Sequence, residues 1–208
     1  MPHIAVMEEK MAAALQVYAE AGGRVVLGAR TGYKDRYGRC RMTPMPGPAA
    51  GLAGVRVREY SLPRPDESAK LSWNGASYPV TGFQESLEAA GSNAAGSYDS
   101  GWLAGEAGLT VKAYPDGGKV WYMGTGFTEE LAGAFLREAG VWSPYAGKID
   151  CPPEVELAVH VKGKTAWYFA LNYTREEKTL KLGTALVPLI GGTVLPPCGV
   201  SVFREERE

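Results

Sequence analysis

The spacing of apolar residues changes along the chain, and each pattern predicts a different kind of secondary structure. Over residues 8–21 apolar side chains recur at helical spacing, and Gly22 and Gly23 end the run. The continuous apolar run at residues 25–27 is typical of a strand covered on both faces of a parallel sheet. We therefore expect half of a βαβ unit, whose first strand could come only from residues 3–7.

From residue 54 to residue 125 the pattern becomes an alternation of apolar and polar positions. It predicts strands at residues 55–60, 70–73, 109–113 and 119–124. The sequence DGG at residues 116–118 is a hairpin signal between the last two strands. Thr128 is predicted to cap the start of a helix, and Gly140 to end it.

After a proline-bearing linker at residues 143–153, the chain continues in short strand-like runs. These runs lie at residues 155–161, 165–171, 178–182, 185–187, 193–195 and 200–203. Short strands at short intervals are typical of a small sandwich or barrel. The predicted fold class is α/β followed by all-β, with an α/β domain over residues 1–147 and a small antiparallel β-sandwich over residues 148–208.

Composition excludes several classes of partner. With 45% hydrophobic and 22% charged residues, the 208-residue chain is an ordinary globular protein that can bury a core. A net charge of -1 gives no broad electrostatic field, so we expect no nucleic acid partner. No apolar run approaches the roughly 20 residues that cross a bilayer, and the N-terminus lacks the pattern of a secretory signal. We expect no membrane partner.

The metal-ligating residue types are few and scattered. Cys40, Cys151 and Cys198 form no CxxC pair, and His3 and His160 are far apart in the sequence. This spacing predicts no zinc site, and we expect neither a metal nor a cofactor. Reduced thiols indicate a cytoplasmic protein.

The polar, glycine-rich loop that follows the first predicted strand raises the question of an active site. Cys40 is flanked by three nearby arginines that could lower its thiol pKa. A nucleophile also needs a base held in place by a third group, and neither histidine is near in sequence. We therefore interpret Cys40 as a surface-loop residue.

Three further features have both a functional and a structural interpretation. Glu85 and Glu106 are the more enclosed choices for a glycosidase acid pair, but nothing in the sequence places them in one cleft. Asn172 begins a glycosylation sequon, which we interpret as a turn after a strand. Aromatic side chains could line a sugar platform, although packing is their commoner role; they are Trp102, Trp121, Tyr122, Trp142, Trp167 and Tyr168.

Six stretches occur in an order and spacing that resemble a known family. They are YAEAGGRVVLGARTGYKDRYGR, PGPAAGLAGVRVREY, YPVTGFQESLE, YPDGGKVWYMGT, ALNYTREEKTLKL and LPPCGVSVFRE. The set resembles the non-catalytic C-terminal half of family 42 β-galactosidases. The first four stretches resemble the trimerisation domain, and the last two resemble the small C-terminal β domain.

The resemblance implies a fold, an activity and an assembly. It implies an amidotransferase-like, flavodoxin-like α/β domain, here truncated at its N-terminus, and a homo-oligomer that is a trimer. Family members are retaining hydrolases of terminal β-D-galactosides whose catalytic glutamates lie on a (β/α)8 barrel. A barrel alone needs about 250 residues, so this chain lacks it. A galactoside substrate would bind only to the missing barrel. No catalytic residue is carried over.

The expected function is therefore a non-catalytic oligomerisation scaffold. Within it, we predict that Lys34, Asp35, Arg36 and Arg39 lie at or near a subunit interface, on a loop that follows a central strand. We also expect the exposed edge of the parallel sheet to be covered by another chain, a rearranged N-terminus or strand exchange. Two alternatives stay open: a free-standing carbohydrate-binding or protein-interaction module, and an enzyme of amidotransferase-like ancestry that uses Cys40.

Overall fold

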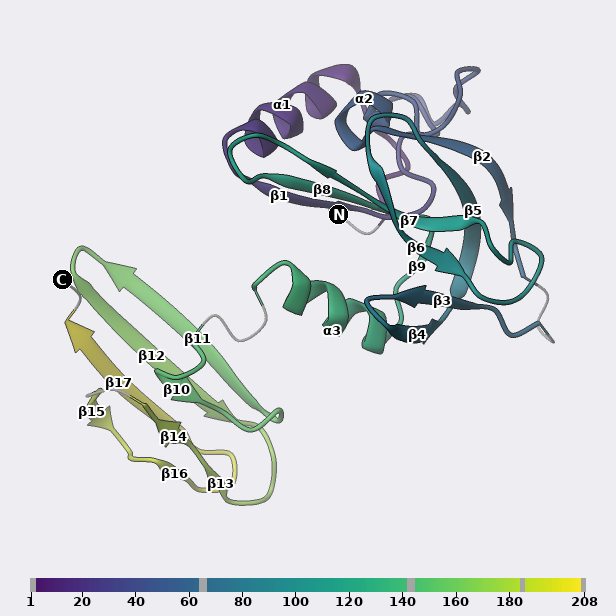
Figure 1. The fold of residues 1–208 in the computed structure, drawn as a ribbon. Coiled ribbons are helices and arrows are strands. Elements are labelled where there is room, and N and C mark those ends of the chain that lie inside the picture. Colours follow the sequence, from purple (N-terminus) through teal and green to yellow (C-terminus); the bar gives the residue numbers. More distant parts are fainter. Residues whose placement is uncertain (1–2, 64–66, 142–144, 184–185, 207–208) are drawn as a thin grey trace. The chain divides into compact units, whose positions relative to one another are not determined.

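A computed structural model describes residues 3–63, 67–141, 145–183 and 186–206. The chain divides into two compact units, Met1–Ala139 and Gly140–Glu208 (Figure 1). The first unit mixes helices and strands and the second consists of strands, which confirms the predicted order of α/β followed by all-β.

A six-stranded sheet runs through the first unit. Its strands lie in the order β1 (Arg24–Leu27), β8 (Lys119–Met123), β7 (Ala107–Ala113), β6 (Asn93–Tyr98), β3 (Lys70–Trp73) and β4 (Ala76–Pro79). Strand β1 pairs in parallel with β8, and the other pairs of this sheet are antiparallel. Our expectation that β1 is a central strand is wrong, because it lies at the end of the sheet.

The segment before the first helix explains this position of β1. Residues 3–7, the expected partner strand, form only a single parallel bridge, between Val6 and Lys34. The segment instead follows the loop after β1, where the backbone N–H of Gly32 donates to Ile4 O at 2.8 Å and that of Lys34 donates to Ala5 O at 2.9 Å.

Strands β2 (Val55–Ser61), β5 (Thr81–Ala89) and β9 (Thr125–Gly126) form a second, antiparallel sheet of the first unit. The alternation of apolar and polar residues does not predict β4, β5 or β6. Small residues interrupt the pattern in β6, and β5 buries Gln84, Glu85 and Ser86.

Helices cover the two faces of the six-stranded sheet. Helix α1 (Glu9–Glu20), close to its predicted bounds, and the short α2 (Ala49–Ala53) pack beside β1 and β8 (Figure 1). On the other face, Phe135 of α3 (Glu129–Glu138) stacks 4.6 Å from Trp73. The predicted cap of α3 is confirmed, because Thr128 Oγ1 accepts a hydrogen bond from the Leu131 backbone at 3.3 Å.

The second unit is an antiparallel β structure. Its main sheet has the order β11 (Val155–Lys162), β12 (Thr165–Asn172), β17 (Val200–Glu206) and β15 (Val187–Ile190). Two short pairs accompany it, β10 (Ile149–Asp150) with β14 (Lys181–Leu182), and β13 (Lys178–Thr179) with β16 (Val194–Leu195). Alternate residues of β12 are buried, and Tyr168 and Phe203 are the largest fully buried side chains of this unit.

Candidate functional site

The tip of the loop at residues 31–48 is shaped by Asp35. One carboxylate oxygen accepts hydrogen bonds from the backbone N–H groups of Tyr37 and Arg39, both at 2.9 Å. A carboxylate that binds its own backbone in this way stabilises a turn. Asp35 therefore orders a loop tip that reaches into solvent.

The other three residues predicted at an interface differ in exposure. Arg36 and Arg39 are exposed, and their guanidinium carbons lie 4.7 and 5.8 Å from the ring centre of Tyr37. Lys34 is half-buried and bridges Cys40 through its backbone. Met42, farther along the loop, is 99% exposed. The loop thus presents two arginines and a tyrosine at its tip, and a methionine farther along, to solvent.

The base of the loop is held by Arg30, a residue that sequence reasoning missed. Its backbone has a φ of 63°, and its N–H donates to Glu85 Oε1 at 3.0 Å. Its guanidinium lies 4.2 Å from the ring centres of both Tyr33 and Tyr60, and 5.2 Å from that of Phe83. Such contacts between a cation and aromatic faces are attractive. They fix the loop to the β2–β5 sheet.

Glu85 is fully buried beneath Arg30. In addition to the Arg30 N–H, its carboxylate accepts a hydrogen bond from the Tyr122 hydroxyl at 2.9 Å. Burial raises the pKa of Glu85 to about 7, although the Arg30 N–H, the Tyr122 hydroxyl and the Arg30 charge each act to lower it. Burial and the Glu85 charge in turn raise the pKa of Tyr122.

Glu106, the other carboxylate considered for an acid pair, is not enclosed as the sequence suggested, and its neighbours differ from those of Glu85. It is exposed, and its Oε2 accepts a hydrogen bond from Ser86 Oγ at 3.0 Å. Ser86 directly follows Glu85 in β5, and successive side chains of a strand point to opposite faces. The two carboxylates therefore belong to different environments on either side of β5.

Cys40 is exposed at the loop, and the histidines lie elsewhere in the fold. The ring of His3 contacts the backbone oxygen of Ala29 at 3.0 Å, and His160 packs edge-on to Phe169 in the second unit. These contacts bring neither a base nor an orienting group to Cys40. They therefore do not support the alternative of an amidotransferase-like enzyme that uses Cys40 as its nucleophile.

Three of the six aromatic residues considered as a sugar platform lie in the cores. Trp121, Tyr122 and Tyr168 are at most 2% exposed, and Trp167 is half-buried. Trp142 lies outside the described residues. Trp102 differs from the others, because 70% of it is exposed beside a cleft that Glu106 also lines.

Asn172, the start of the sequon, is a buried structural residue. Its amide nitrogen donates to the backbone oxygens of Glu176 at 2.7 Å and Pro196 at 2.9 Å. Its amide oxygen accepts hydrogen bonds from both the backbone and the hydroxyl of Thr174. This side chain holds the turn after β12, as the structural interpretation predicts.

Comparison with known proteins gives the family. Residues 1–143 match the family described as the β-galactosidase trimerisation domain, and residues 154–205 match the family described as the β-galactosidase C-terminal domain.

The chain belongs to the β-galactosidase trimerisation-domain family.

Individual relatives agree with this assignment. β-Galactosidase BgaH of Haloferax lucentense is 28% identical over 202 residues, which are 97% of this chain and 30% of BgaH. β-Galactosidase BgaA of Clostridium cellulovorans is 28% identical over 181 residues, covering 85% of this chain and 27% of BgaA. The chain therefore spans less than a third of the length of these relatives.

Solved structures share the fold of both units. Gan42B, a GH42 β-galactosidase from G. stearothermophilus, matches 99% of this chain and 31% of its own chain with a TM-score of 0.86 at 17% identity. The β-galactosidase of Halorubrum lacusprofundi matches 99% of this chain and 30% of its own with a TM-score of 0.77 at 23% identity. Together with the two family matches, this makes the chain the trimerisation and C-terminal portion of a GH42 β-galactosidase, without the catalytic barrel.

Membership of a trimerisation-domain family indicates a homo-oligomer.

Within the described residues, no group of three or more histidine, cysteine or acidic side chains is placed to hold a metal ion. None of the helices that the structure describes is both long and apolar enough to cross a membrane.

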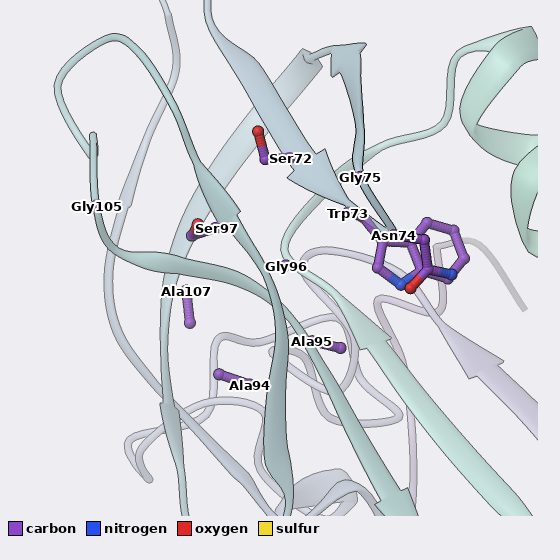
Figure 2. A pocket seen from close by; sticks show the side chains of 10 residues that line it. All are labelled: Ser72, Trp73, Asn74, Gly75, Ala94, Ala95, Gly96, Ser97, Gly105 and Ala107. Atoms are coloured by element: carbon purple, nitrogen blue, oxygen red, sulfur yellow. The ribbon is translucent and has the colours of Figure 1, made fainter.

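One cleft of this trimerisation domain offers little for a ligand to bind. It measures about 350 Å³ and is lined mainly by glycine, alanine and serine, while Trp73 and Asn74 lie together at the turn between β3 and β4 (Figure 2). The hydroxyl of Ser72 already donates to Asp99 at 3.0 Å. The small side chains form a shallow surface without convergent polar groups.

Proposed function

We propose that this chain is the non-catalytic, subunit-joining part of a β-galactosidase that hydrolyses terminal β-D-galactosides, and that it assembles as a trimer. The family match over residues 1–143 supports the assembly role. Substrate chemistry belongs to polypeptide outside this chain, because the relatives named β-galactosidases are more than three times as long as the part matched here.

The loop at residues 31–48 is part of the proposed subunit contact. The observation that carries this assignment is that Asp35 orders a tip on which Arg36 and Arg39 are exposed, with Met42 exposed farther along the loop. An arginine presents a planar set of donors that can bind a carboxylate through two hydrogen bonds, which favours one specific pairing. An ordered tip also loses less conformational freedom on binding than a mobile one.

A cytoplasmic location is part of the proposal. The cysteines Cys40, Cys151 and Cys198 are all free, and Cys40 and Cys198 are exposed. Exposed free thiols suit a reducing compartment, where disulfides are rare.

The absence of intrinsic catalysis is tested by incubating the purified chain with a chromogenic β-galactoside. We expect no hydrolysis above the buffer rate, because the Glu85 and Glu106 carboxylates have separate environments. Turnover that copurifies with the chain and disappears in Glu85→Gln or Glu106→Gln would contradict the proposal.

A further inference from the structure

A second cleft of the first unit, of about 370 Å³, is lined by side chains of a different chemistry. Arg58 and Glu59 of β2, Ser86 of β5, and Trp102 and Glu106 of the loop between β6 and β7 line it. Glu59 lies directly opposite Ser86 in the β2–β5 ladder. The volume of this cleft is at the small end of the roughly 300–1,000 Å³ range of ligand pockets, which suits a ligand of one or two rings.

The loop that carries Trp102 is anchored before any ligand arrives. The backbone N–H of Trp102 donates to a carboxylate oxygen of Glu67 at 3.1 Å. Within the loop, the N–H of Glu106 donates to Leu103 O at 2.9 Å, and that of Gly105 donates to Tyr98 O at 2.8 Å. Leu103 is 4% exposed and ties the loop to the core. The backbone that carries the exposed indole is therefore fixed.

The polar groups of the cleft combine donors and acceptors. The hydroxyl of Ser86, a residue that is 3% exposed, donates a hydrogen bond to Oε2 of Glu106. The other carboxylate oxygen, Oε1, can accept a hydrogen bond from a ligand. Arg58 pairs with Glu88 through its Nε at 3.3 Å, and its terminal amino groups can still donate. Glu59 supplies a second acceptor carboxylate.

The charges of these groups decide between classes of ligand. Two carboxylates against one arginine leave the cleft with an excess of negative charge, which disfavours phosphates and acidic sugars. A neutral sugar ring offers hydroxyl donors and acceptors along its edge and an apolar face for stacking on an indole. A neutral sugar ring therefore fits a cleft in which an exposed tryptophan lies beside both hydrogen-bond donors and acceptors.

We propose that this cleft, formed by Trp102, Glu106, Ser86, Arg58 and Glu59, binds a neutral sugar ring. Trp102 stacks on the apolar face of the ring, and Glu106 and Arg58 bind its hydroxyl groups. The choice of a galactoside as the probe rests on the proposed function, whereas the cleft itself does not depend on subunit assembly.

The test is a titration of the ¹⁵N-labelled full chain with methyl β-D-galactoside, followed by NMR through the indole N–H signals. The signal of Trp102 is the one that disappears in Trp102→Phe. We expect it to shift and saturate with a Kd on the order of millimolar, and affinity to fall by at least about tenfold in Trp102→Ala and in Glu106→Gln.

Tyr173→Ala is the matched control. Tyr173 is an aromatic residue of the second unit that is 68% exposed, nearly as much as Trp102, and it does not line the cleft. It should bind the galactoside as the wild-type chain does. Because Trp102 is anchored through its backbone, Trp102→Ala should keep the wild-type spectrum outside the cleft. No saturating shift at about 100 mM galactoside, or equal affinity of Trp102→Ala and Tyr173→Ala, would overturn the proposal.

Light scattering on the same samples separates this proposal from the assembly role. An assembled chain that does not bind the galactoside would overturn the sugar site and leave the assembly role intact. A monomer that binds it through Trp102 would support the site and overturn the assembly role.

Discussion

The carboxyl group of Glu85 has a raised pKa because it is buried. It is fully buried and depends on the Arg30 N–H and the Tyr122 hydroxyl for its hydrogen bonds. The sequence offered Glu85 as an enclosed carboxylate, but it could not show what encloses it. Arg30 is 55 residues away in sequence and Tyr122 is 37, so their contacts with Glu85 depend on the tertiary fold.

The raised pKa of Glu85 makes stability depend on pH. Because the folded chain binds this proton more tightly than the unfolded chain does, its stability is greatest below pH 4.5 as far as this group is concerned. It falls as the pH rises toward about 7 and levels off above that value. The difference between the two pKa values corresponds to about 3 kcal/mol.

In Glu85→Gln this contribution should disappear, since the amide carries no charge and can still bond to Arg30 and Tyr122. Urea unfolding at pH 5 and pH 8 measures it, with the exposed Glu59→Gln as the control. Equal pH dependence in Glu85→Gln and the wild-type chain would show that Glu85 is not the group responsible.

Asn172 has an equally specific role in the second unit. Asn172→Ala should destabilise this unit by about 2–4 kcal/mol, because the backbone oxygens of Glu176 and Pro196 lose their donor. Thermal unfolding followed by circular dichroism checks this, with Lys164→Ala in the exposed hairpin turn as the control. A melting temperature as high as that of the control would mean that water replaces the lost bonds.

Secondary-structure elements with a local signal could be predicted, and those defined by tertiary pairing could not. Helix α3 has its cap and its terminating glycine in one stretch of sequence, and the structure matches both. Strand β5 has no such local signal, because Gln84, Glu85 and Ser86 are buried by neighbours from distant segments. The end position of β1 likewise depends on where residues 3–7 lie, which apolar content alone does not determine.

The cap of α3 gives a prediction for a single element. Thr128→Ala should lower the stability of the first unit by about 1 kcal/mol, because the Leu131 N–H loses its partner. Thr128→Ser keeps the hydroxyl and should remain close to wild type. Urea unfolding of the three chains distinguishes them, and identical midpoints for all three would show that the cap contributes nothing.

The sequence motifs already indicated the fold and the family of the whole molecule, but not the conformation of its surface loops. The motifs named the trimerisation and C-terminal domains, and the family matches confirm them. The order of the loop tip depends on how Asp35 binds the backbone, which sequence spacing does not show.

Charge reversal at the loop tip tests where subunits meet. Arg36→Glu combined with Arg39→Glu should shift the chain toward monomer at a given concentration, measured by light scattering after gel filtration. Lys162→Glu combined with Lys164→Glu changes the net charge equally in an exposed hairpin of the second unit and should leave the mass unchanged. Equal masses for the two double variants would remove the loop from the contact.

The proposed assembly of the chain can be measured directly. Light scattering of the wild-type chain over a roughly hundredfold range of concentration measures its mass directly. We predict a species of three times the 22.3 kDa of a single chain at the higher concentrations of this range. A mass of 22.3 kDa at every concentration would contradict the claim that this chain joins subunits.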